Sequence, residues 1–559
     1  MDKRAIIAII LSMLVIIIWQ LIFAPSPKEP SVIEEQEEQP AIEARREEVP
    51  KESRDEEVPT YTERDESNVR DVVVETPLYR AVLTTAGARL KSWALSEYMD
   101  SKKSIVLWRR KEVDPPQPIE MVPGRGLKDL PLATQLRLNG GVERDLVFDV
   151  DTAGLTVESD SVGSLVFVGQ TEEGLEVVKR FWFNSDQYRI DLEVELINRA
   201  DRPMNPQLTM IWSGVVAPGG RYTFSGPSVL SAGEVARLKP KEIRKGRTFT
   251  ENVKWMASDD NYFLSMVAPQ EADAVRVDVQ GREIPETEGV GFENRLTFPE
   301  KKVMPGGHEK FSFLIYIGPK LPELLKGLDI EAEKAINFGK WLGSIEKGLL
   351  FFLEFTHGLT GNYGVDIIIL SILLKIVFWP LSRKSYKSMQ EMQKIQPEMK
   401  MLQEKYKNDR ERLNQEMMAL YKRRKVNPVG GCLPMLVQFP FLIALYKALP
   451  LSFNLRHAPF VLWLQDLSAA DTFFVDELPL PILGNTPVGP LPLLMGVSML
   501  LQQKMSPTMG DPRQAKMMMI MPIMFIFIFL GFPSGLVLYW FVQNLLSIGE
   551  QYYTKRKGS

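Results

Sequence analysis

Apolar and polar residues alternate with a period of two at several places between residues 71 and 318. The alternation is clearest in YRIDLEVEL at 188–196, and it returns in AVRVDV at 274–279 and FSFLIYI at 311–317. This period is typical of strands that bury one face. Many short segments of this kind, separated by Gly, Pro and Asn, predict a large all-β sandwich over residues 71–318.

Long apolar runs replace the alternation toward the C-terminal end. We expect a helical core at 359–559, and its five predicted membrane spans are 362–381, 428–449, 491–503, 517–532 and 534–548. A span usually needs about 17–25 residues, so the last three should extend into their flanks or cross where the bilayer is thin. The pattern predicts a multi-domain membrane protein with a polytopic α-helical core.

A further apolar run at 5–23, behind Lys3 and Arg4, predicts an N-terminal membrane anchor over residues 1–24. A cleavable signal is the alternative, but its apolar region is usually shorter. With this anchor the chain has six transmembrane helices in total.

Two segments join these parts. Residues 25–70 are expected to be a disordered linker, because 28–70 holds fifteen acidic and seven basic residues and few large apolar ones. A partner-binding tail is the alternative. Residues 319–358 mix apolar and charged residues at helical spacing, which predicts an amphipathic helix in the membrane interface. The alternative is that this helix packs on the sandwich.

Basic residues at four places predict the orientation. Lys3 and Arg4, the segments 383–425 and 504–516, and the tail at 555–557 are rich in Lys and Arg, as cytoplasmic segments are. With six spans both termini are then cytoplasmic. The sandwich lies on the other side of the membrane, in what would be the periplasm of a bacterium.

The segment 383–425 carries thirteen basic and six acidic residues. Its apolar residues recur every three or four positions on both sides of a KND turn at 407–409, which predicts a helical hairpin. The cations expected to contact ribosomal RNA or anionic lipid headgroups are Lys394, Lys400, Lys405, Lys407, Arg410 and Arg412. A cytoplasmic loop needs no partner to be basic, so the alternative is that they contact nothing specific.

Composition argues against catalytic and metal chemistry. Cys432 is the single cysteine, and His308, His357 and His457 have no metal-ligand spacing. No phosphate loop or nucleophile elbow is visible. We therefore expect no enzymatic activity, no cofactor and no small-molecule substrate. A membrane-anchored periplasmic enzyme acting on sugars is the alternative.

Lys375 stands within the apolar run GVDIIILSILLKIVFWPL, with Ser371 one turn earlier on the same face. A lysine in mid-span costs about 2.5–3.5 kcal/mol and usually faces a bundle interior or a watery cavity, although it can also snorkel to the headgroups. Asp366 is on nearly the opposite face, and the later predicted spans hold no acidic residue. We therefore expect Lys375 to be an unpaired cation.

Amide side chains in other spans accompany this cation, namely Gln438, Gln502, Gln503, Gln543 and Asn544. Together with Lys375 they predict a hydrated groove that opens toward the cytoplasm. Interhelical hydrogen bonding is the alternative role for them.

Four motifs resemble the YidC family of membrane-protein insertases, which is related to mitochondrial Oxa and chloroplast Alb proteins. They are NPVGGCLPMLVQFPFLIALY from Asn427, APFVLWLQDLSAAD from Ala458, LMGVSMLLQQKMSPT from Leu494 and FPSGLVLYWFVQNL from Phe532. The anchor and large β domain resemble the Gram-negative form. Lys375 matches a groove position that is usually Arg in this family. Ser371 matches a position that is often Thr, and Trp540 matches a position that is often Tyr.

The resemblance implies a function. Such a protein inserts and folds nascent integral membrane proteins in the inner membrane, taken from ribosomes, alone or with the Sec translocon. The substrate groove would then comprise Lys375, Ser371, Gln438, Gln502, Trp540 and Asn544. A secondary transporter of a small anion is the alternative function, but no inverted repeat or acidic proton relay is detectable.

Overall fold

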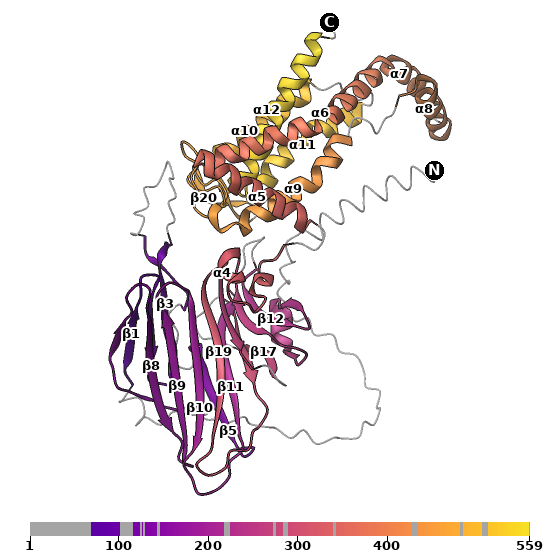
Figure 1. The fold of residues 1–559 in the computed structure, drawn as a ribbon. Coiled ribbons are helices and arrows are strands. Elements are labelled where there is room, and N and C mark those ends of the chain that lie inside the picture. Colours follow the sequence, from indigo (N-terminus) through magenta and orange to yellow (C-terminus); the bar gives the residue numbers. More distant parts are fainter. Residues whose placement is uncertain are drawn as a thin grey trace, which may run out of the picture.

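A computed structural model describes most of the chain from residue 69 onward. The described residues are 69–100, 116–122, 126, 129–141, 146–216, 224–271, 275–282, 289–338, 342–407, 409–426, 433–480, 484–505 and 512–557. The predicted anchor at 1–24 and nearly all of the predicted linker at 25–70 lie outside them. Figure 1 shows a β domain and a helical part, one at each end of the described chain.

The described residues of the β domain form three sheets. In spatial order, the nine-stranded sheet is β13 (Glu234–Arg237), β12 (Gly226–Ser231), β15 (Trp255–Asp259), β16 (Phe263–Pro269), β19 (His308–Pro319), β10 (Arg189–Asn198), β9 (Leu175–Asn184), β8 (Val162–Gln170) and β6 (Asp149–Val150). One five-stranded sheet is β4 (Pro118–Glu120), β3 (Arg89–Met99), β2 (Tyr79–Thr84), β1 (Asp71–Glu75) and β7 (Gly154–Thr156). The other is β14 (Arg247–Phe249), β17 (Arg276–Arg282), β18 (Val290–Thr297), β11 (Pro206–Val216) and β5 (Ala133–Leu138), and a short helix α3 (Pro240–Lys245) precedes β14.

The large sheet packs face to face against both small sheets. The Tyr79 hydroxyl of β2 donates to the Asn184 carbonyl of β9 at 3.0 Å, and Asn294 Nδ2 of β18 donates to the Ala257 carbonyl of β15 at 3.0 Å. Buried side chains of all three sheets form one hydrophobic cluster. The domain is therefore a sandwich, as the alternating pattern predicted.

The strand predictions are also confirmed in detail. YRIDLEVEL lies in β10, which pairs with β9 on one side and β19 on the other. Its inward residues Ile190, Leu192, Val194 and Leu196 are all buried. The other two alternating segments fall in β17 and β19.

The core of the β domain extends past residue 318. The connector after β19 contains α4 (Pro322–Lys326) and the 3-10 turn η2 (Ala332–Ala335), and Leu325 and Ala332 belong to the sandwich cluster. Lys320 Nζ lies 2.6 Å from Asp259 Oδ1, and both side chains are almost fully buried. The first part of the segment 319–358 thus packs on the sandwich, while its second part forms the long helix α5 (Gly343–Thr360).

The rest of the helical part follows α5. Its elements are α6 (Tyr363–Lys394), α7 (Gln396–Lys405), α8 (Arg410–Arg424), α9 (Leu433–Leu451), η3 (Phe453–Leu455), the strand pair β20 (Val475–Leu480) and β21 (Gly484–Val488), α10 (Pro490–Met505), α11 (Pro512–Phe529) and α12 (Ser534–Lys557). Helices α6, α9, α10, α11 and α12 overlap the five predicted spans of the core. Among the described helices, α6 alone is both long and apolar enough to cross a membrane, and Val437–Leu449 and Ile520–Phe529 are shorter apolar segments.

Helix α12 runs nine residues beyond the predicted end of its span at 548. The prediction ended the span where apolar residues give way to polar ones. Most of those polar residues, such as Glu550, Gln551 and Lys555, sustain a helix well in water. The extension contains Glu550, which contacts Lys375 in the candidate site described below.

Helix α6 continues past its apolar part and meets α7, and α8 returns beside them as a hairpin. The arms share a small core of Met392, Ile395, Met399 and Leu420. At the turn between α7 and α8 the Asp409 carboxylate accepts the Arg412 N–H at 3.0 Å and so caps α8. In Figure 1 this hairpin and the end of α12 project away from the β domain.

The β domain contacts the helical part through Phe453 in η3. This ring lies edge-on to Tyr98, Phe263 and Tyr262, with centroids 4.9, 5.5 and 6.3 Å away. The Arg456 guanidinium covers the rings of Tyr262 and Phe263 at 5.6 and 5.4 Å from their centroids. We call these five residues the interdomain joint.

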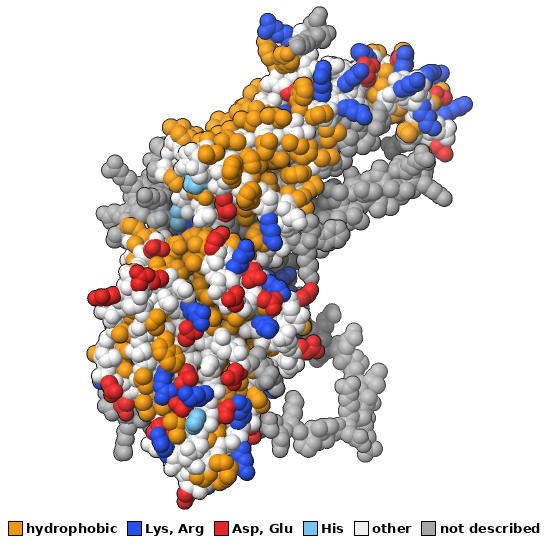
Figure 2. All heavy atoms as spheres, in the orientation of Figure 1, with side chains coloured by type: hydrophobic (Ala, Val, Ile, Leu, Met, Phe, Trp, Pro, Cys, Tyr) orange, Lys and Arg blue, Asp and Glu red, His pale blue; other side chains and the backbone are white. Residues whose placement is uncertain are grey.

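Apolar side chains cover the visible face of the helical bundle, and Lys and Arg gather on the projecting hairpin (Figure 2). On α6 the exposed apolar residues include Ile376 and Val377, which are 65% and 58% exposed, and Leu501 and Ile520 are exposed on α10 and α11. An apolar surface of this extent, bordered by a basic end, is typical of contact with lipid.

Candidate functional site

Lys375 lies on the side of α6 that faces α12. Its Nζ is 2.8 Å from Glu550 Oε2 and donates to Ser547 Oγ at 2.8 Å. The side chains of Lys375 and Glu550 are each only 17% exposed. Ser547 in turn donates to the Gln543 carbonyl at 2.8 Å. The cation therefore sits in a pairing that the chain itself supplies.

The contact between α6 and α12 continues one turn away. Gln543 Nε2 donates to the Ser371 carbonyl at 2.8 Å, and the Ser371 hydroxyl donates to the Ile367 carbonyl at 2.7 Å. Ser371 pairs with Gln543 and Lys375 with Ser547, so the numbering increases in the same direction along both helices. The two helices run parallel.

Helix α12 also bonds to α9 and α10. Gln438 Nε2 donates to the Tyr539 hydroxyl at 3.0 Å, and Asn544 Nδ2 donates to Ser498 Oγ at 3.0 Å. The polar residues joined by these contacts along α12 and its neighbours are Ser371, Lys375, Gln438, Ser498, Tyr539, Gln543, Asn544, Ser547 and Glu550. We call this set the polar seam.

The structure brings four of the six predicted groove residues into this seam, namely Lys375, Ser371, Gln438 and Asn544. Trp540 lies beside it, half-buried against Phe525 and Phe529 with ring centroids 6.1 and 5.5 Å apart. Gln502 is half-buried near the end of α10. Hydrogen bonding between helices, the alternative role considered for the amides, accounts for the contacts of Gln438, Gln543 and Asn544.

The expectation that Lys375 is unpaired is wrong. Its partner Glu550 lies two residues past the predicted span, where the apolar run had already ended. A usable signal was present, because positions 543, 547 and 550 recur at intervals of four and three and therefore share one face of a helix. Extending α12 by one turn would have placed a carboxylate on that face.

The predicted hairpin cations lie on exposed surface. Lys400, Lys405, Lys407 and Arg412 are exposed, and Lys394 Nζ lies 2.9 Å from Glu391 Oε1 in an exposed pair. The side chain of Arg410 lies outside the described residues. The hairpin therefore presents several cations to solvent, and none of the five predicted cations whose side chains the structure describes is enclosed by the bundle.

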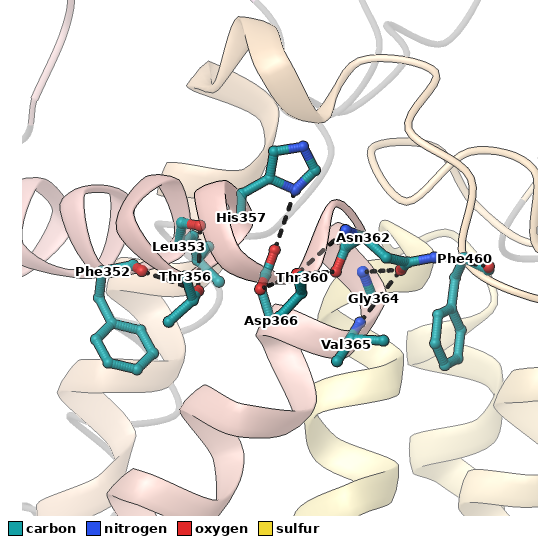
Figure 3. A network of polar contacts seen from close by, with 10 residues as sticks. All are labelled: Phe352, Leu353, Thr356, His357, Thr360, Asn362, Gly364, Val365, Asp366 and Phe460. Carbon is teal, nitrogen blue, oxygen red and sulfur yellow. Dashed lines mark hydrogen bonds and ion pairs between the residues drawn. The ribbon is translucent and has the colours of Figure 1, made fainter.

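A second polar network lies at the opposite end of α6 (Figure 3). Asp366 is fully buried; it accepts the Thr360 hydroxyl at 2.7 Å and lies 3.2 Å from His357 Nδ1 on α5. Asn362 caps α6 through the Gly364 N–H at 2.9 Å and donates to the Phe460 carbonyl at 3.1 Å. Asp366 thus joins α5 to α6. It does not pair with Lys375, which agrees with the sequence prediction that the two residues lie on nearly opposite faces of the helix.

The loop that contains Asp466 caps the start of α12. The Ser534 N–H donates to the Ala469 carbonyl at 2.7 Å, and the Ser534 hydroxyl donates to the Asp466 carbonyl. Burial by itself would raise the pKa of the Asp466 carboxyl. Hydrogen bonds from His457 and Ser468 outweigh burial and hold that pKa below its ordinary value.

Among the described residues no group of three or more His, Cys, Asp or Glu side chains is arranged to hold a metal ion.

These features define an integral membrane protein in which a helical bundle with an internal polar seam carries a large β domain. The "60Kd inner membrane protein" family model matches residues 355–559, and the "YidC periplasmic domain" model matches residues 71–352. The chain belongs to the YidC family of membrane protein insertases.

Relatives along the whole length support this assignment. "Membrane protein insertase YidC" of Syntrophus aciditrophicus is 36% identical over 573 residues, covering 100% of both chains. The protein of the same name in Geotalea uraniireducens is 37% identical over 562 residues, covering 100% of this chain and 99% of its own. A crystal structure titled "Active YidC insertase" covers 99% of this chain and 100% of its own at 18% identity, with a TM-score of 0.37. The assignment therefore rests on the sequence relatives, which bear the name of an insertase and not of an enzyme or a transporter.

Proposed function

We propose that this protein inserts other membrane proteins into the bacterial inner membrane and helps them to fold. The observation that carries the proposal is the polar seam, a line of hydrogen-bonding groups with a cation that runs inside a bundle whose surface is apolar. Full-length similarity to insertases favours this function over the transport of a small anion.

In the proposed mechanism a polar flank of a nascent client exchanges contacts with the seam and with two residues outside it, Gln502 and Trp540. The proposed contact residues are Lys375, Ser371, Gln438, Gln502, Trp540 and Asn544. A polar group that moves into hydrocarbon without a hydrogen-bond partner costs several kcal/mol, and the seam supplies such partners part-way across. Because the seam groups are bonded to one another, a client enters by exchanging bonds, with a temporary widening between α12 and its neighbours.

The apolar part of the client then moves sideways into lipid. Burial of apolar surface at about 25 cal/mol per Å² supplies the driving force. For acidic flanks the membrane potential adds about 2.3 kcal/mol per charge per 100 mV. The mechanism needs no nucleotide and no cofactor.

The proposed orientation places the hairpin and both chain ends in the cytoplasm and the β domain in the periplasm. It is supported by the basic hairpin and by the projection of α12 away from the β domain in Figure 1. Six membrane helices, including the anchor at 1–24, complete the proposed arrangement. Exposed cations such as Lys400 and Arg412 then face the ribosome and anionic lipid headgroups, and the Sec translocon is a further proposed partner.

Site-specific photocrosslinking to ribosome-bound nascent chains tests the function. Trp540 is the better probe position, because Ser371 is fully buried beneath α12. Leu545, on the same helix but 46% exposed on the apolar surface, is the matched control. We expect crosslinks to clients from position 540 well above those from position 545. Equal yields from the two positions, or none from 540, would contradict the proposal.

A further inference from the structure

The cation of the polar seam already has a carboxylate bound to it. Lys375 Nζ is 2.8 Å from Glu550 Oε2, and Ser547 Oγ accepts a second hydrogen bond from the same ammonium at 2.8 Å. A client carboxylate that approaches Lys375 therefore does not meet a bare charge. It meets an ion pair in which the chain supplies the anion.

We infer that Glu550 is a resident competitor for Lys375 and sets how strongly the site selects acidic client segments. The inference rests on the proposed function and deepens it. An incoming carboxylate takes the place of Glu550 on the ammonium, and no covalent bond changes. Selection by such a site is a difference between two affinities, and an internal competitor lowers the affinity for carboxylates alone.

An internal competitor is effective because it is held in place. A group tethered on a neighbouring helix acts at a high effective concentration, so a client carboxylate must bind more strongly than Glu550 does, or arrive at a higher local concentration. Pairing also lowers the cost of keeping Lys375 inside the bundle, since a buried cation without a partner is strongly unfavourable. Glu550 thus keeps the seam stable and restricts its use.

The Glu550 carboxylate lies close to solvent, so it can leave Lys375 without remaining buried. Glu550 lies near the C-terminal end of α12, and its neighbours Tyr552 and Tyr553 are 63% and 57% exposed. A change of rotamer can therefore carry the Glu550 carboxylate toward water when a client occupies Lys375. The resting pair and the client-bound pair then differ by an exchange of one carboxylate for another.

A simpler role for Glu550 is to stabilise the packing of α12 against α6. The bond from Gln543 to the Ser371 carbonyl already joins these helices one turn away, and Asn544 and Tyr539 join α12 to α10 and α9. Loss of the Glu550 carboxylate therefore leaves the helix packing in place. If Glu550 only holds the two helices together, its loss should affect acidic and neutral clients equally. If it competes for Lys375, its loss should change the ratio of acidic to neutral client inserted.

The test uses the full chain in proteoliposomes and two clients that differ only by Asp and Glu against Asn and Gln in the translocated flank. We expect Glu550→Gln to raise the ratio of acidic to neutral client inserted by about fivefold or more, the lower end of ordinary coupling between sites. The ratio is the measured quantity, because Glu550 belongs to the polar seam and its loss also acts on the insertion of the neutral client. In a Lys375→Gln background the same substitution should leave the ratio unchanged, because the group competed for is gone.

Glu398→Gln is the matched control, because Glu398 pairs with Arg424 in the hairpin, away from the seam. An equal rise in this control would make the effect one of overall charge and overturn the inference. An unchanged ratio in Glu550→Gln, or an equal loss for both clients, would also overturn it. If the wild-type chain inserted neither client, the proposed function itself would fail, which keeps the two failures distinguishable.

Discussion

The Phe453 ring of the helical part lies edge-on to the Phe263 ring of the β domain, with centroids 5.5 Å apart and planes at 89°. Tyr98, Tyr262 and Arg456 complete the joint around these two rings. The β domain is therefore docked on the loop after α9 and is not held by its chain connection alone. Motion of one part relative to the other must break this aromatic contact.

Phe453→Ala should loosen the joint. Each edge-to-face pair is worth about 0.5–1.5 kcal/mol beyond its buried area, so losing the three ring contacts of Phe453 should cost docking about 1.5–4.5 kcal/mol. Hydrogen–deuterium exchange should then be faster in the turn around Tyr262, while the core strand β10 keeps its protection. Asn454→Ala, at an exposed neighbouring position, is the control. Unchanged exchange around Tyr262 would show that the joint contributes nothing to docking.

Removal of the β domain should leave insertion largely intact, because the polar seam lies wholly in the helical part. The structure shows that the deletion must extend to Ile336. A deletion that ended at Val303 would leave β19 without its partner strands. One that ended at Pro319 would leave Leu325 and Ala332 without the sandwich core on which they pack. Complementation of a depleted strain by a chain lacking residues 74–336 measures the outcome. Loss of activity by a stably expressed deletion would assign an essential role to the β domain.

Substitution of Lys375 should separate charge from shape. Lys375→Arg should keep activity, because the cation and its pairing with Glu550 are retained. Lys375→Glu places two carboxylates together in a low-dielectric seam and should reduce insertion of acidic clients by about tenfold or more. Neutral clients should be affected less, since Gln438 and Asn544 remain. Equal insertion of acidic and neutral clients by Lys375→Glu would leave Lys375 only a structural role, its pairing with Glu550.

Labelling of single cysteines should report the orientation of the hairpin. In a Cys432→Ser background, a cysteine at the exposed position Glu411 should react with an impermeant thiol reagent only in inverted vesicles, because thirteen cations favour the cytoplasmic side. A cysteine at Asp186, exposed in the β domain, should react only from the other side. Labelling of position 411 from the periplasmic side would contradict both the orientation and the proposed mechanism.

Acid should weaken the cap of α12 through Asp466. Because the folded pKa of this carboxyl is held below its ordinary value, its contribution is complete at neutral pH and is lost as the pH falls through the folded pKa. Asp466→Asn should therefore lower the free energy of unfolding at neutral pH by about 1.5–3 kcal/mol, the worth of hydrogen bonds to a charged group. The difference from wild type should begin to shrink once the pH falls below the ordinary aspartate pKa of about 3.9, and it should keep shrinking at lower pH. A difference that stays constant across denaturant titrations at these pH values would exclude this carboxyl as the cause.

Much of the architecture could be predicted from the sequence, because strand and helix periods depend on nearby residues. The period of two in YRIDLEVEL marked β10, and long apolar runs marked α6, α9, α10, α11 and α12. The sequence likewise singled out Lys375, since a cation in an apolar run is costly whatever surrounds it. These features follow from local chemistry and need no knowledge of the fold.

The partners of those residues were decided by the tertiary structure alone. Lys375 and Glu550 are far apart in the chain, and only the parallel packing of α6 and α12 brings them together. The same holds for Phe453 and Phe263, whose contact depends on how the sandwich sits on the loop after α9. Whether a buried charge is free or paired depends on distances of a few ångströms across such interfaces, and a one-dimensional pattern of apolar and polar positions carries no such distances.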